Sequence, residues 1–312
     1  MIRRRLDAEL VRRGLARSRD QAADLIGAGR VRVAGQTAGK AATQVEAAAA
    51  IIVEAADSGP DYVSRGGHKL AGALEAFTGL DPAGRRCLDA GASTGGFTDV
   101  LLRAGAGHVV AVDVGYGQIA WSLRTDDRVT VVERLNIREL TPEHVAARPG
   151  GDPDAAREGT APGGAAGPAG PPDGRPGARA AAAADVGAGG PPGELPSLVV
   201  ADLSFISLKL VLAPIQRCVT PDADYVMMVK PQFEVGRERV GAGGVVRDPG
   251  LRAAAVRDVA DQAWSLGLGV RGVTASPLPG PSGNVEYFLW LRAGAPPLAA
   301  ADLDRAVAEG PR

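Results

Sequence analysis

The sequence predicts an α/β protein in which a doubly wound, mostly parallel sheet follows a small α+β module. Three observations support this prediction. Short apolar runs alternate with helical segments between residues 86 and 292, as crossover helices between parallel strands require. A glycine-rich turn follows the first of these runs, where doubly wound folds bind nucleotides. The first forty residues differ from the rest in charge and in hydrophobic rhythm.

Residues 1–58 form the N-terminal module in this prediction. Its first helix is indicated by apolar residues at helical spacing, which are Leu6, Leu10 and Val11. Ser18 is a favourable N-cap for a second helix, and short strands are expected around Val31–Val33 and Ile51–Val53. The module is therefore expected to fold as a compact α+β unit.

Charge is unevenly distributed along the chain. The formal net charge is −1, but residues 1–40 contain ten basic and four acidic residues, so they carry +6 and the remainder −7. A basic module on an acidic body is typical of proteins that hold a polyanion at one end. A solvated face is the alternative, and the small number of acids in the module favours RNA binding. The predicted RNA-binding residues are Arg4, Arg5, Arg12, Arg13, Arg17, Arg19, Arg30 and Arg32.

Seven strands are predicted in the larger part of the chain. They are Cys87–Ala90, His108–Asp113, Val129–Glu133, Leu198–Asp202, Tyr225–Lys230, Val270–Ala275 and Glu286–Leu291. The connection Ser276–Asn284 is rich in proline and glycine and is too short for a crossover helix. The last strand is therefore expected to run antiparallel to its neighbour.

Residues 148–196 interrupt the alternation of strands and helices. Val186 is the only large aliphatic residue between Pro149 and Glu194, so the segment cannot bury enough apolar surface to offset its ordering entropy. We predict a disordered insertion here. On either side of it, residues 59–147 and 197–294 are predicted to form one larger domain. Residues 295–312 are predicted to be a C-terminal tail.

The glycine-rich turn after the first strand is a candidate cofactor site. Asp113 closes the second strand, 22 residues after Gly91, where an acid can bind both ribose hydroxyls of a nucleoside cofactor. A tight structural turn is the alternative. The spacing departs from G-x-G-x-x-G, and the carboxylate of Asp89 would repel a pyrophosphate but would suit an amino group.

These details and the antiparallel last strand favour S-adenosylmethionine over NAD as the cofactor. The predicted cofactor-binding residues are Asp89, Gly91, Ala92, Ser93, Thr94, Gly95, Gly96, Phe97, Asp113 and Asp202. Phe205 is expected to pack in the core or against the cofactor. Tyr116 and Trp121 are expected either to flank the adenine or to pack in the core.

Five segments of the chain carry a resemblance to a known family. They are Tyr62–Leu70, Leu88–Thr98, Ala201–Ser207, Val229–Glu234 and Gly280–Tyr287. In these segments and in their order, the chain resembles the TlyA family of ribosomal RNA 2′-O-methyltransferases, which are historically labelled haemolysins. Its first fifty-odd residues resemble the S4 RNA-binding domain of that family. The resemblance implies a Rossmann-like class I methyltransferase sheet, S-adenosylmethionine as cofactor, and cytidines of 16S and 23S rRNA as substrate.

The catalytic domain of this family is similar to FtsJ-type ribose methyltransferases, which use a Lys-Asp-Lys-Glu set. The resemblance implies catalytic roles for Lys69, Asp202, Lys230 and Glu286. The strand pattern agrees, because Asp202 and Lys230 close neighbouring strands and Glu286 opens the antiparallel one. We expect Lys230 to accept the ribose proton beside the cationic Lys69, with the two carboxylates orienting the amine. Taken singly, each of the four could be a surface salt-bridge residue.

The remaining features limit the setting in which the protein acts. Cys87 and Cys218 lie in apolar runs and are expected to be reduced core residues. The sequence shows no metal-ligand spacing, signal peptide or membrane-spanning run. We therefore expect a metal-free, cytoplasmic monomer whose partners are rRNA and ribosomal subunits. An RNA base-modifying enzyme and a membrane-lytic haemolysin stay open as less favoured alternatives.

Overall fold

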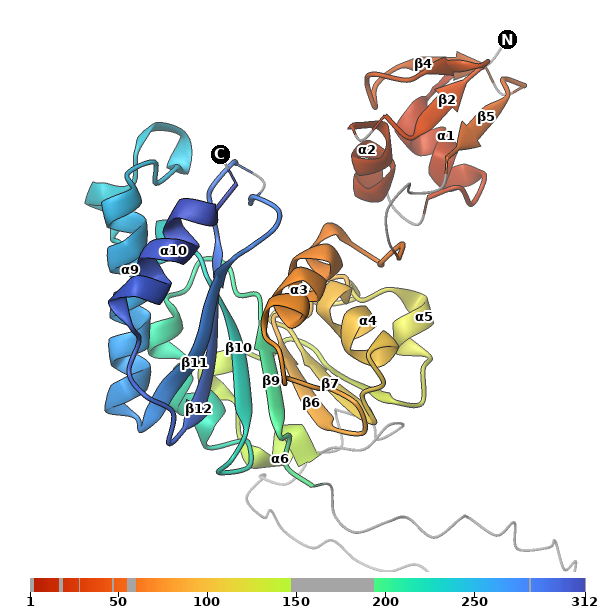
Figure 1. The fold of residues 1–312 in the computed structure, drawn as a ribbon. Helices are drawn as coiled ribbons and strands as arrows, with labels where there is room; N and C mark the ends of the chain where they lie inside the picture. Colours follow the sequence, from red (N-terminus) through yellow and green to blue (C-terminus); the bar gives the residue numbers. More distant parts are fainter. Residues whose placement is uncertain are drawn as a thin grey trace, which may run out of the picture. The chain divides into compact units, whose positions relative to one another are not determined.

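The computed structural model describes two compact units of the chain, Met1–Ser64 and Arg65–Arg312 (Figure 1). The described residues are 3–16, 19–27, 29–46, 48–54, 60–146, 194–280 and 282–311. The predicted disordered insertion lies outside them except for residues 194–196, and so do Arg17 and the predicted cap Ser18.

The first unit packs two helices against short antiparallel strands. Its elements are β1 Arg3–Arg5, α1 Leu6–Arg12, α2 Arg19–Gly27, β2 Val31–Val33, β3 Gln36–Thr37, β4 Gln44–Glu46 and β5 Ile51–Val53. Strand β1 pairs with β4, while β3, β2 and β5 form a second small sheet. Leu6, Leu10, Ile26 and Val31 are buried in a common core. Both predicted helices and both predicted strands are present, and β1, β3 and β4 were not predicted.

The second unit is built on a seven-stranded sheet. Its strands are β6 Arg86–Ala90, β7 His108–Val112, β8 Val129–Val132, β9 Leu198–Ala201, β10 Asp224–Val229, β11 Leu268–Ala275 and β12 Tyr287–Ala293. Their order is β11-β12-β10-β9-β6-β7-β8. Strand β12 runs antiparallel to both of its neighbours, and the strands from β10 to β8 are parallel. The predicted sheet and its reversed last strand are thus confirmed, with strand ends within two residues of the prediction.

Helices cover both faces of this sheet (Figure 1). They are α3 Arg65–Ala76, α4 Gly96–Arg103, α5 Trp121–Arg124, α6 Pro142–Ala146, α7 Leu212–Gln216, α8 Pro231–Glu234, α9 Pro249–Ser265 and α10 Ala300–Glu309. Short 3₁₀ turns are η1 Ile137–Glu139, η2 Leu208–Leu210, η3 Arg237–Arg239 and η4 Ala242–Gly244. Tyr287 and Leu289 face a core shared with α7, α9 and α10, whereas Phe288 contacts Phe97 of α4 on the opposite face. Successive residues of one strand therefore pack on different helix layers.

The segment expected as a C-terminal tail contains helix α10. Leu303 and Ala306 are buried against the sheet and belong to its main core. Their spacing of three residues places both side chains on one face of the helix. The prediction of a plain tail is therefore wrong for residues 300–309, because one short apolar face is enough to hold this helix on the sheet.

Candidate active site

Three of the four predicted catalytic residues lie where strands reach the same edge of the sheet. Asp202 follows β9, Lys230 follows β10, and Glu286 directly precedes β12. The antiparallel register of β10 and β12 sets Lys230 level with Glu286. Lys69 reaches this group from helix α3. The structure therefore brings together four residues that are distant in the sequence.

The four residues form two ion pairs. Lys230 Nζ lies 2.6 Å from Asp202 Oδ1 and donates to Ser204 Oγ at 2.9 Å. Lys69 Nζ donates to Glu286 Oε2 at 2.5 Å. Both lysines and Glu286 are buried, whereas 25% of the Asp202 side chain is exposed. The Lys230–Asp202 pair can thus be reached from solvent, while the Lys69–Glu286 pair is closed.

The glycine-rich turn between β6 and α4 lies against the same edge. Gly91 has a φ of +87°, and a Cβ atom there would lie 2.8 Å from the carbonyl oxygen of Asp202. Gly95 has a φ of +94°, and a Cβ atom there would overlap Leu123 Cδ1. Only glycine combines this backbone conformation with so close an approach. The turn is therefore in direct contact with the segment that carries Asp202.

Asp113 holds this turn from the neighbouring strand. Its Oδ2 accepts a hydrogen bond from the backbone N–H of Ser93 at 2.8 Å, and its Oδ1 accepts one from Gly115 at 2.6 Å. The residue is half-buried, and each carboxylate oxygen can accept a further hydrogen bond. Asp113 can therefore accept hydrogen bonds from hydroxyl groups while it keeps its two hydrogen bonds to backbone N–H groups.

Asp89 is fully buried beside the turn. Its Oδ2 accepts from Thr98 Oγ1 at 2.6 Å, and its Oδ1 has no hydrogen-bond partner among the described residues. Burial, together with the charges of Asp202 and Asp113, raises the pKa of Asp89 to about 7. Three carboxylates around one turn favour a positively charged ligand.

The other predicted cofactor residues differ in exposure. Ser93 and Thr94 are exposed at the tip of the turn, whereas Ala92 and Gly96 are buried. The ring of Phe97 is buried and packs on Phe288, with 6.1 Å between the ring centroids. A ligand in the turn would therefore meet the backbone of this segment and the side chains at its tip.

The exposed aromatic side chains differ from the prediction. Phe205 is 91% exposed, which excludes the core alternative and leaves the cofactor alternative as a prediction; its ring lies 5.2 Å from that of Phe233. Tyr116 and Trp121 are 67% and 75% exposed, which excludes the core alternative for both. The Tyr116 ring packs instead under the guanidinium group of Arg134, 4.1 Å from the ring centroid.

Polar side chains that the sequence analysis did not single out support the site. Ser204 accepts from Lys230, and the buried Glu234 ties helix α8 to the loop after β9. Asn284 is buried two residues before Glu286 and makes two hydrogen bonds of 2.9 Å to the loop before α9. All three lie in segments that carry the family resemblance, but one sequence does not tell which polar residue of a motif faces which neighbour.

Two acids of the first unit are each paired with two of its arginines, contrary to the expectation that few acids would do so. Asp7 accepts hydrogen bonds from Arg5 and Arg19, and Glu9 accepts from Arg12 and Arg13. These guanidinium groups hold the pKa of both carboxyl groups well below the ordinary range. Asp7 and Glu9 thus neutralise part of the positive charge that the sequence analysis predicts to bind RNA.

The other predicted RNA-binding residues vary in their pairing. Arg32 pairs with Glu54, and the guanidinium group of Arg30 lies 3.9 Å from Asp61. Arg4 is exposed on β1 and forms no ion pair with any residue that the structure describes. The charge available to a polyanion is therefore smaller and more localised than the composition indicates.

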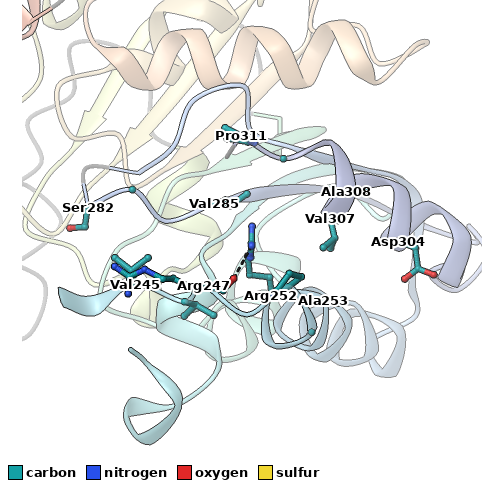
Figure 2. Close-up of a pocket in the computed structure, with 15 residues that line it drawn as sticks. Val245, Arg247, Arg252, Ala253, Ser282, Val285, Asp304, Val307, Ala308 and Pro311 are labelled. Carbon is teal, nitrogen blue, oxygen red and sulfur yellow. Dashed lines mark hydrogen bonds between the residues drawn. The ribbon is translucent and has the colours of Figure 1, made fainter. Parts of the chain in front are cut away.

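The structure also contains a cavity of about 830 Å³, whose lining residues are drawn in Figure 2. It lies between the start of α9, helix α10 and the segment Ser282–Val285, which precedes Glu286. Arg252 extends into it and donates to the backbone oxygen of Arg247 at 2.9 Å (Figure 2). Its lining includes neither the glycine-rich turn nor the four candidate catalytic residues, so it is separate from the candidate site.

Membrane-spanning helices and metal-binding clusters are both absent from the part of the chain that the structure describes. None of its helices combines the length and the apolar character needed to cross a bilayer. Within the same residues, no group of three or more His, Cys, Asp or Glu side chains is arranged to hold a metal ion.

Two family models match the chain. Residues 62–293 match the FtsJ-like methyltransferase model, and residues 4–51 match the S4 domain model. The first match spans the whole candidate site, from the segment before α3 to the end of β12. The second coincides with the basic α+β unit.

Individual proteins match over nearly the whole length. The chain is 54% identical over 314 residues to the 16S/23S rRNA (cytidine-2′-O)-methyltransferase TlyA of Mycobacterium tuberculosis, covering 99% of both chains. It is 32% identical to Hemolysin A of Brachyspira hyodysenteriae, covering 91% of this chain and 98% of the other. A solved structure described as a hemolysin of Streptococcus thermophilus is 31% identical, with a TM-score of 0.67 and coverage of 99% and 96%.

Proposed function

This chain belongs to the TlyA family and joins an S4 domain to an FtsJ-like methyltransferase domain, and from that premise we propose that it methylates ribose 2′-hydroxyl groups of ribosomal RNA. The proposed donor is S-adenosylmethionine, and the proposed acceptors are cytidines, which the name of the M. tuberculosis relative specifies. One observation carries the proposal: the buried amine of Lys230 is held by Asp202 and Ser204 beside the glycine-rich turn.

The residues around the turn fit S-adenosylmethionine in charge. This donor supplies a methyl group activated on a positively charged sulfonium sulfur, and its amino group is a second cation. Asp89, Asp113 and Asp202 surround the turn with carboxylates that favour such a ligand. Asp113 would accept the ribose hydroxyls, and the unpartnered Oδ1 of Asp89 would face the amino group directly or through a water molecule.

Lys230 is proposed to take the proton of the attacking 2′-hydroxyl. A ribose hydroxyl is a weak nucleophile and must lose its proton as it attacks in line. The Lys230 nitrogen has three hydrogen-bonding directions, of which Asp202 and Ser204 occupy two. The third is left for the substrate. The buried Lys69–Glu286 pair would supply a second fixed cation to the site.

The S4 unit is proposed to hold the rRNA from which the target sugar is presented. Its basic side chains offer phosphate contacts, which supply most of the sequence-independent affinity for nucleic acids. This division assigns RNA affinity chiefly to the first unit and chemistry to the second. We propose that the protein acts in the cytoplasm, where its ribosomal substrate is assembled.

The Lys230→Arg variant tests the proposed base. We expect it to bind S-adenosylmethionine and rRNA like the wild type, while single-turnover methylation falls by about 100- to 10,000-fold. Guanidinium keeps its proton near neutral pH and cannot accept another, so arginine should restore no more activity than alanine. Lys209→Arg is the matched control, because Lys209 is half-exposed and pairs with Asp258.

The readout is 2′-O-methylation mapped on purified rRNA after one turnover. Substantial activity of Lys230→Arg would reduce Lys230 to an electrostatic clamp and leave deprotonation to water. Absence of any 2′-O-methylation by the wild-type protein, on rRNA from cells that lack it, would overturn the proposed function itself.

A further inference from the structure

The loop that follows β9 is joined to helix α8 by three successive contacts. Ser204 Oγ accepts from Lys230 Nζ at 2.9 Å, at the start of the helix. Phe205 then contacts Phe233, with 5.2 Å between the ring centroids. The last contact is made by Glu234, which closes the helix and faces the end of the loop. Loop and helix therefore form one unit around the proposed catalytic amine.

Glu234 uses both of its carboxylate oxygens in this contact. Oε2 accepts from Ser207 Oγ at 2.5 Å, and Oε1 accepts from the backbone N–H of Leu208 at 2.8 Å. The side chain is 7% exposed, and burial raises the pKa of its carboxyl group. A carboxyl group at such a depth is costly unless its oxygens are hydrogen-bonded. Its position therefore indicates a specific bracing contact with the loop.

The backbone of the loop needs such a contact. Phe205 has a φ of +64°, in the left-handed region that non-glycine residues adopt only at an energetic cost. Its ring is almost fully exposed, so packing within the loop does little to stabilise this conformation. A strained residue keeps its conformation only when its surroundings fix it from outside. Glu234 fixes the loop two and three residues further on.

We propose that Glu234 is a positioning residue for methyl transfer. By fixing Ser207 and Leu208, it holds the loop in the position in which Asp202 and Ser204 contact Lys230. Its hydrogen bonds go to Ser207 and Leu208, and none goes to the cofactor turn or to the four proposed catalytic side chains, all of which the structure describes. The inference rests on the proposed function, because it concerns the orientation of the Lys230 amine as the proposed base.

Glu234→Ala should lower the single-turnover rate of rRNA methylation by about 10- to 100-fold, since small displacements of a catalytic group have effects of this size. The dissociation constant for S-adenosylmethionine should stay within about threefold of the wild type, because the glycine-rich turn is held by other contacts. Glu238→Ala is the matched control: this carboxylate is exposed four residues further along and should leave the rate unchanged. Equal rates for Glu234→Ala and the wild type would overturn the proposal.

Glu234→Gln separates positioning from a charge effect. Its amide oxygen can accept from Leu208 N–H, and its NH₂ group can donate to Ser207 Oγ, so both links survive without the charge. We expect a rate within about threefold of the wild type, with an unchanged pH profile. A glutamine variant as impaired as Glu234→Ala would show that the charge is what matters and would overturn the positioning role.

Ser207→Ala tests the same link from the loop and keeps the contact between Glu234 and Leu208, so it does not depend on the folding of Glu234→Ala. Its rate should fall by about 3- to 10-fold, and adding it to Glu234→Ala should cost nothing further, because both changes break one brace. Wild-type activity in Ser207→Ala, or full additivity in the double variant, would contradict the proposal. An inactive wild type would instead overturn the proposed function.

Discussion

The carboxyl group of Asp89 couples folding and the proposed cofactor site to pH. Its pKa of about 7 lies above the value of about 3.9 for an exposed aspartate, so the folded protein holds a proton that the unfolded chain releases between these values. Folded-state stability therefore decreases as the pH rises from about 4 to 7. A cation bound at the turn would favour ionised Asp89 and lower its pKa.

Affinity for S-adenosylmethionine should therefore increase as the pH rises toward 7 and level off above it. The slope is at most about tenfold per pH unit, because binding would release one proton. Asp89→Asn has no proton to release and should bind more weakly, without this slope. Asp99→Asn is the control, since Asp99 pairs with Arg103 on α4. Titration calorimetry from pH 5.5 to 8.5 measures the affinity of the three proteins for S-adenosylmethionine. A pH-independent affinity of the wild type would show that Asp89 does not contact the cofactor.

At the level of single residues, strand ends could be predicted from the sequence but side-chain partners could not. Asp202 and Lys230 follow from apolar runs that stop at a charged residue and Glu286 from a run that starts after one, and the sheet does bring them to one edge. The roles of Ser204 and Glu234 depend on the path of the loop after β9. That path is set by long-range contacts and leaves no periodic pattern in the sequence.

The elements of the sheet depend on a buried network at the opposite end of β10. Asp224 opens this strand and is 2% exposed. Its carboxylate accepts from Arg85 Nη1 at 2.9 Å, from Trp290 Nε1 at 2.8 Å and from Arg292 Nη1 at 3.0 Å. The network joins β6, β10 and β12 about 20 Å from Lys230, at roughly 3.3 Å per residue of strand.

Asp224→Ala should lower the free energy of unfolding by an amount near the lower end of the range of about 3–5 kcal/mol for a broken buried ion pair. The lower end applies because both guanidinium groups are partly exposed and can be hydrated. Asp222→Ala removes an exposed carboxylate two residues away, which interacts with the same two guanidinium groups only across solvent, so it should lower stability much less. Urea unfolding followed by circular dichroism compares the two, and equal midpoints would show that the network adds no stability.

The long apolar elements could be predicted better than the short ones. Strands such as β7 and β9 are buried on both faces, so continuous apolar runs mark them clearly. Strand β1 consists of three arginines, and its pairing with β4 comes from tertiary contact rather than from propensity. Helix α10 was missed for a similar reason, since it buries only a narrow apolar face.

The whole molecule combines two units with different proposed tasks. Removing residues 1–58 should leave affinity for S-adenosylmethionine within about twofold, because every residue of the proposed cofactor site lies in the second unit. Methylation of rRNA should be lost, since phosphate contacts of the basic first unit are proposed to supply most of the affinity for rRNA. Cofactor titration and 2′-O-methylation mapping on the truncated protein test both parts. A truncated protein that modifies rRNA at the wild-type rate would place the RNA affinity in the second unit.

The position of β12 has a consequence for biosynthesis. Among the seven strands of the described sheet it leaves the ribosome last, yet it inserts between β10 and β11. Until it emerges, β10 has one open edge along six buried residues, and β11 has no partner in the sheet that the structure describes. Open apolar edges recruit other chains. A nascent chain released before residue 287 therefore keeps this edge, and a premature stop codon ahead of that residue should yield aggregated or degraded protein rather than a soluble, inactive enzyme.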